Sequence, residues 1–113
     1  MKIDKPTPED VLHTLMWARA LIKRGWTKHK CTNRKAIRSD KVGTRYCAMG
    51  AIYATTDDYQ LQQAARMALG RALKVPGIAH FNDHRDTKKR DVINLYDRAI
   101  ECLSQRIKPK KNS

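Results

Sequence analysis

Residues 47–54 of the chain read Cys47-Ala48-Met49-Gly50-Ala51-Ile52-Tyr53-Ala54. The segment carries no charge, and most of its side chains are small or aliphatic. It is far shorter than the ~20 apolar residues that a membrane-spanning helix needs. Small side chains allow neighbouring elements to approach closely, so we predict that this segment forms a short, fully buried helix.

Three longer segments carry apolar residues at steps of four, three and four, which place them on one face of an α-helix. The three stripes are Val11, Leu15, Ala18 and Ile22; Leu61, Ala65, Ala68 and Ala72; and Val92, Tyr96, Ala99 and Leu103. The sequence therefore predicts an all-α or mainly α fold, with three long helices and one short buried helix in a compact bundle.

The first long helix has clear signals at both ends. Thr7 can cap it and Pro8 suits its first position. Gly25 ends the helix, and we expect Trp26 to fold back on it in a Schellman-type cap. Trp17 lies away from the apolar stripe and is predicted to be exposed.

The later boundaries are marked by polar residues. The T-x-x-D pattern of residues 55–58 predicts a capping box before the second long helix. Residues 78–86 are interpreted as a connector without helix. Asp86 or Thr87 is then expected to cap the last helix.

Length and composition predict a single helical domain over residues 1–107, followed by a disordered basic tail over 108–113. A small β-hairpin is a further possibility within residues 30–45. The first residues lack the apolar stretch of a secretory signal, and the cysteines are odd in number and far apart. We therefore expect a cytoplasmic protein with free thiols and no membrane partner.

The chain is strongly basic, with 24 Lys and Arg against 11 Asp and Glu, for a net charge of +13. The charge is unevenly placed. Residues 23–45 hold nine basic and one acidic side chain, and residues 85–113 hold nine and four, whereas the remaining segments are neutral. Clustered charge is typical of a surface that binds polyanions, although a disordered basic loop would give the same count.

Two groups of cations are the candidate anion-binding residues. The first follows the first long helix, and the second lies at the start of the last helix, where free N–H groups also favour anions. Asp86 and Asp91 could instead offset the second group and leave it merely solvated. The candidates are Lys28, Lys30, Arg34, Lys35, Arg38, Lys41, Arg45, Lys88, Lys89 and Arg90.

The cluster from His80 to His84 is the only candidate for catalysis. Together with Asp83 the two histidines could form a general acid–base pair or a metal site, and a nuclease would suit the charge. A zinc site that adds Cys31 and Cys47 is a weaker alternative, because these cysteines are not paired as C-x2-C. Turn formation explains the cluster more simply, so we predict no catalytic residue, no metal and no cofactor.

Five short motifs resemble, in order, a helical family of unknown function found in bacteria, notably actinobacteria, and in their phages. They span 21–26, 46–52, 78–83, 91–93 and 97–100, and the Cys-Ala-x-Gly-Ala-Ile motif is the most specific. The resemblance covers roughly residues 11–103. Here Phe81 replaces a usual Trp, and the gap before Thr87 is shorter. The resemblance implies a helical fold and a phage or prophage origin, and it implies no activity.

The first functional hypothesis is a small non-enzymatic protein that binds the backbone of RNA or DNA through residues 23–45 and 85–113. The second is a phage inhibitor or adaptor that docks on an acidic host or defence protein, or sequesters an anionic nucleotide. The third is a nuclease that uses His80, Asp83 and His84.

Overall fold

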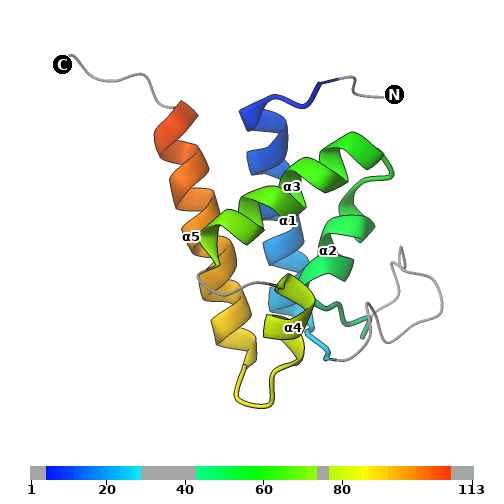
Figure 1. Cartoon of the computed structure of the whole chain (residues 1–113). Coiled ribbons are helices and arrows are strands. Elements are labelled where there is room, and N and C mark those ends of the chain that lie inside the picture. The colour runs from blue at the N-terminus through cyan, green and yellow to red at the C-terminus, as the bar shows by residue number, and fades with distance from the viewer. Residues whose placement is uncertain (1–4, 29–42, 74–76, 108–113) are drawn as a thin grey trace.

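The computed structural model describes residues 5–28, 43–73 and 77–107, and these ranges are mainly helical. The helices are α1 (Pro8–Arg24), α2 (Ala48–Thr55), α3 (Tyr59–Ala72), α4 (Ile78–Asp83) and α5 (Lys89–Ile107) (Figure 1). The prediction of a mainly α fold is confirmed. No helix of the described ranges is both long and apolar enough to cross a bilayer.

Within the described ranges there is no strand, and Trp26 and Tyr46 form one isolated parallel bridge. The predicted hairpin falls largely on residues 29–42, which lie outside the described residues, as does the predicted tail over 108–113.

Helices α1 and α5 pack side by side and run in opposite directions (Figure 1). Helix α3 crosses both, and α2 packs against α1 and α3. The short α4 contacts α2 and lies at the end of the bundle where α1 finishes and α5 starts. This arrangement brings the last turn of α1, the α4–α5 turn and the first turn of α5 to one end of the molecule.

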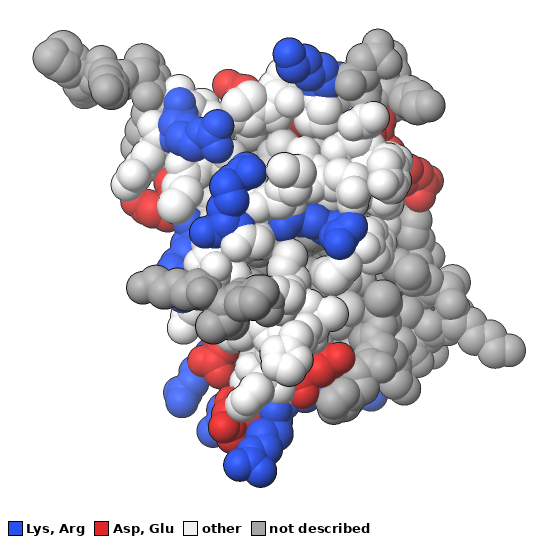
Figure 2. Space-filling model, in the orientation of Figure 1, with Lys and Arg blue, Asp and Glu red and all other residues white. Residues whose placement is uncertain are grey.

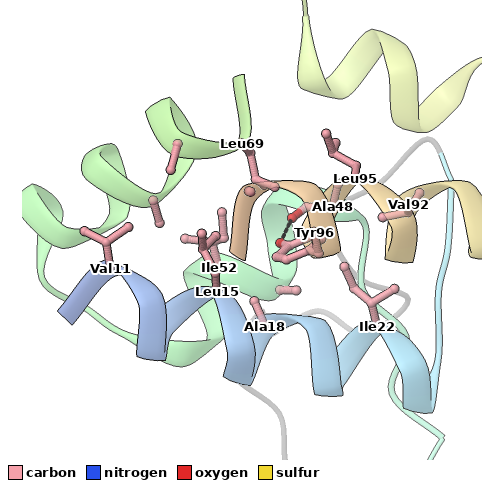
Figure 3. Packing of buried hydrophobic residues seen from close by; sticks show 14 of the residues in the cluster. Val11, Leu15, Ala18, Ile22, Ala48, Ile52, Leu69, Val92, Leu95 and Tyr96 are labelled. Carbon is pink, nitrogen blue, oxygen red and sulfur yellow. Dashed lines mark hydrogen bonds between the residues drawn. The ribbon is translucent and has the colours of Figure 1, made fainter. Parts of the chain in front are cut away.

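The core is built from the predicted stripes, which converge between the helices (Figure 3). Every residue of the first and third stripes is buried, and Ala72 of the second stripe is partly exposed. Ala18, Ala48, Ala51 and Ala65 are fully buried. Because these side chains are so small, the helices that carry them can lie close together.

The start of α1 is as predicted: Thr7 caps the helix, and Pro8 opens it. Asp10 also accepts from the Thr7 N–H, which completes a reciprocal capping box. The predicted Schellman-type cap at its end is wrong. Gly25 has a φ of −175°, an extended backbone rather than a left-handed one. A Cβ on Gly25 would lie 2.7 Å from Cγ of Arg45 and 3.0 Å from the Thr44 carbonyl oxygen. Because glycine has no Cβ, Thr44 and Arg45 can lie directly against the backbone at this position.

The boundary between α2 and α3 also differs from the prediction. Thr55 belongs to α2, and its hydroxyl donates to the Ile52 carbonyl at 2.7 Å. Asp58 is the capping residue of α3, since its carboxylate accepts from the Leu61 N–H at 3.0 Å. The predicted capping box with Thr55 as the cap is therefore wrong, because α2 extends through Thr55 and α3 begins only at Tyr59.

The predicted connector over residues 78–86 is partly helical, since α4 occupies its first six residues. Helix α5 begins at Lys89, so neither Asp86 nor Thr87 caps it. Instead, the Lys88 N–H donates to the Asp91 carboxylate at 2.8 Å, from the first turn of the helix itself. Thr87 is buried and forms a turn with the His84 carbonyl.

Candidate anion-binding site

At the α4 end of the bundle, the first basic segment contacts the residue that immediately precedes the second. Nζ of Lys28 donates to the His84 carbonyl at 2.6 Å, immediately before the second segment begins at Arg85. The same ammonium lies 5.5 Å from the centre of the Trp26 ring, within range of a cation–π interaction. The first described cation after α1 is thus fixed beside the α4–α5 turn.

A buried amide holds these segments together. Asn82 is 1% exposed, and its Oδ1 accepts from Nε1 of Trp26 at 2.7 Å and from the Ala48 N–H at 3.0 Å. Its Nδ2 donates to the Thr27 carbonyl and to the Asp83 carboxylate. All the hydrogen-bonding capacity of the amide is therefore used. Sequence reasoning missed this role and assigned Asn82 to local turn bonds.

We define the basic end as the exposed or half-exposed cations that this arrangement gathers. Two lie in the last turn of α1, one contacts His84, one lies beside Gly25, and the others flank the start of α5. They are Lys23, Arg24, Lys28, Arg45, Arg85, Lys88, Lys89 and Arg90.

Three acidic residues lie among these cations, and cations outnumber them. The Asp91 carboxylate is bonded to the Lys88 N–H, and the Asp86 carboxylate lies 3.9 Å from Nε of Arg85. Asp83 accepts from Asn82. Within the described ranges no carboxylate pairs with Lys89 or Arg90, which sit in the first turn of α5 against its dipole. Figure 2 shows Lys and Arg at this lower end, interleaved with Asp and Glu.

Five of the predicted site residues belong to the basic end: Lys28, Arg45, Lys88, Lys89 and Arg90. The other five, Lys30, Arg34, Lys35, Arg38 and Lys41, lie outside the described residues. Lys23, Arg24 and Arg85 were within the segments that sequence reasoning marked as basic, but it did not single them out. Charge counts alone could not show that the last turn of α1 and the α4–α5 turn, which carry these three residues, lie at the same end of the bundle.

The candidate catalytic cluster has an open geometry. His80 and His84 are exposed, and their ring centres are 6.3 Å apart in an edge-to-face arrangement. Nδ1 of His84 accepts from the Asp86 N–H at 3.1 Å. In the described part of the chain, no group of three or more His, Cys, Asp or Glu is placed to hold a metal ion. Cys31 lies outside the described residues, and Sγ of Cys47 accepts from the Gly50 N–H as the cap of α2.

The opposite end of the bundle has a shallow pocket of about 230 Å³. Its apolar wall includes Val11, Met67 and Leu103, and Arg71 and Arg106 also line it. These two arginines are exposed and lie on α3 and α5, away from the basic end. They carry the same charge as two cations of the basic end, at a different place on the surface.

Over residues 6–101 the chain matches the family described as Family of unknown function (DUF6197). The chain belongs to the DUF6197 family. No curated protein and no solved structure matches it. The expected membership in a family of unknown function is thereby confirmed, and the DUF6197 match covers all five described helices except the last residues of α5.

Proposed function

We propose that this DUF6197 protein is a non-enzymatic module that binds nucleic acid by its phosphate backbone, at the basic end. The proposal rests on the contact between Lys28 and the His84 carbonyl, because this contact places a cation of the first basic segment beside the start of the second. Exposed cations gathered on one surface create the positive potential that a polyphosphate backbone requires. A phage or prophage origin and a place in the host cytoplasm belong to the same proposal.

The shape of the basic end supports backbone contacts rather than the reading of base edges in a duplex. Its cations come from the end of one helix, two turns of chain and the start of another helix. A recognition helix would instead present a row of polar side chains to a groove. Contacts to phosphate position a protein on nucleic acid without selecting a sequence.

The test is fluorescence anisotropy with dye-labelled oligonucleotides of mixed sequence over a salt series. We expect the affinity to fall steeply between ~50 and ~200 mM salt, because bound phosphates release counterions. The double variant K89E/R90E should weaken binding at least ~10-fold and lower the salt slope by about 2.

The matched control is the double variant R71E/R106E, which makes the same change of charge at the opposite end. Its affinity and salt slope should stay close to those of the unchanged protein. Micromolar or weaker binding without a salt slope contradicts the proposal, as do equal losses in the two double variants. A partner that survives nuclease treatment of a host lysate and is lost in K89E/R90E favours docking on an acidic protein instead.

A further inference from the structure

The solvent face of α1 carries an exposed tryptophan next to the basic end. Trp17 is 68% exposed, although large aromatic side chains are usually buried. The helical period places three further residues on the same face as Trp17. His13 lies four residues before Trp17, Ala20 lies three residues after it, and Arg24 lies four residues after Ala20. All of these residues are exposed, and the core stripe of α1 lies on the other side of the helix.

We propose that the nucleic acid at the basic end is single-stranded and that one of its bases stacks on Trp17. This inference rests on the proposed function and adds the substrate class to it. The indole offers a free π-face, and a base–aromatic stack does not depend on which base is present. Ala20, which lies between Trp17 and Arg24 on this face, has a small side chain and adds little bulk there.

The spacing on α1 fits a continuous strand. Trp17 and Arg24 are seven residues apart, which corresponds to about 10 Å along a helix. Consecutive phosphates of a stacked strand are ~3.4 Å apart along its axis, so about three nucleotides span this distance. A strand with a base on Trp17 therefore reaches Arg24 with its phosphates, and continues over the rest of the basic end.

A single strand suits this surface better than a duplex or a protein. In a duplex both faces of each internal base are already stacked, so an exposed indole gains nothing from it. Continuous exposed apolar patches of several hundred Å² mark many protein-docking surfaces. Here the apolar residues Trp17 and Met16 are bordered by His13 and Arg24 on the same helix, and the charge complements phosphate.

The experiment compares an oligodeoxythymidine of about 16 nucleotides, the upper site size of a small module, with a duplex of the same length. Binding is followed by anisotropy and by tryptophan emission. The chain has two tryptophans, and Trp26 has its indole N–H bonded to Asn82. The difference in emission between the unchanged protein and Trp17→Ala is the contribution of Trp17. We expect the single strand to quench this contribution and the duplex to leave it unchanged.

The variants separate stacking from charge. Trp17→Ala should weaken single-strand binding roughly 5- to 150-fold and leave duplex binding unchanged. Trp17→Phe should retain part of the affinity, because it keeps an aromatic face. Met16→Ala is the matched control, since Met16 is a neighbouring exposed apolar residue, and it should bind as the unchanged protein does. All three variants should unfold at the same temperature as the unchanged protein.

The outcomes distinguish the two proposals. If Trp17→Ala and Met16→Ala bind the single strand equally well, or if the duplex binds more tightly, the stacking inference is overturned and backbone binding stands. If neither nucleic acid binds, the proposed function itself fails. If Trp17→Ala no longer binds a nuclease-resistant protein partner but keeps its affinity for nucleic acid, this face is a protein-docking surface.

Discussion

The indole N–H of Trp26 donates to Oδ1 of Asn82 at 2.7 Å, across 56 positions of sequence. The same oxygen accepts from the Ala48 N–H, so the segment after α1, the start of α2 and helix α4 meet at one amide. Because the amide is buried, its hydrogen bonds have no competition from water. This junction positions Lys28 and the α4–α5 turn, and therefore the basic end.

Replacing Asn82 should destabilise the protein strongly. Asn82→Ala leaves the Trp26 and Ala48 donors without their partner inside the fold, at about 1–3 kcal/mol for each buried group. We expect urea unfolding to show a loss of about 2–5 kcal/mol. Asn94→Ala, at an exposed position of α5, is the control and should change the free energy of unfolding by no more than ~0.5 kcal/mol. Equal losses in both variants would show that the buried amide is not the junction.

The two glycines Gly25 and Gly70 should respond in opposite ways to alanine. At Gly25 the new Cβ would meet the Thr44 carbonyl oxygen at 3.0 Å and Cγ of Arg45 at 2.7 Å, so the neighbouring chain must shift. We expect a loss of about 1–3 kcal/mol, as for other overpacked sites. At Gly70, inside α3, nothing lies within 4 Å of the new Cβ. Alanine there should stabilise the helix by about 0.5–1 kcal/mol. Thermal unfolding of the two variants measures both effects.

The buried hydroxyl of Tyr96 donates to the Ala48 carbonyl (Figure 3). Burial raises the pKa of Tyr96 well above its ordinary value, and the charge of Cys47 raises it further. Below pH ~10 the phenol is protonated in both states and stabilises the fold fully. Above pH ~10 the unfolded chain releases this proton and the folded chain keeps it, so stability falls by up to ~1.4 kcal/mol per pH unit.

Tyr96→Phe tests this linkage. At pH 7 it should lose about 1 kcal/mol, because the hydrogen bond to Ala48 is absent. As the pH rises above ~10, the difference between the two proteins should shrink, since phenylalanine has no proton to release. Denaturant unfolding at several pH values gives the comparison. A difference that is constant across this range would contradict the raised pKa.

The closeness of α1 to its neighbours depends on small side chains. Ala18 is fully buried on α1, whereas Ala20 on the same helix is exposed. Ala18→Leu should therefore cost about 1–3 kcal/mol by overpacking the core. Ala20→Leu adds the same atoms to the solvent face and should remain within ~0.5 kcal/mol of the unchanged protein. Chemical denaturation compares the two, and an equal loss in both would argue against close packing at Ala18.

The predicted helices succeeded where the signal is local. The stripe from Val11 to Ile22 and the cap at Thr7 need only the helical period and a side chain that reaches three residues ahead. Two local signals misled: Gly25 is extended rather than left-handed, and Thr55 belongs to α2 instead of capping α3. The other failures concern α4 and the start of α5. Helix α4 has only six residues and no side-chain cap, so no periodic pattern could mark it. The start of α5 was misplaced because the N–H of Lys88 donates to the Asp91 carboxylate inside the helix, so the helix needs no cap from Asp86 or Thr87.

The candidate site was predictable in part. Charge counting marked both basic segments, and it included Lys28, Arg45 and the run from Lys88 to Arg90. It could not show that Lys28 contacts the turn between α4 and α5, which directly precedes Lys88. The role of Asn82 left no signal in the sequence, because its partners Trp26, Thr27 and Ala48 are distant along the chain.

The sequence by itself therefore determined the mainly helical fold, most residues of the core and the total charge, since periodicity and capping act over a few neighbouring residues and charge follows from composition. Only the tertiary structure decided that Lys28 lies against the His84 carbonyl and that Asn82 joins three segments. The physical reason is that these contacts form when packed helices bring distant stretches of chain to one end of the bundle. Their geometry depends on the packing of every helix between them.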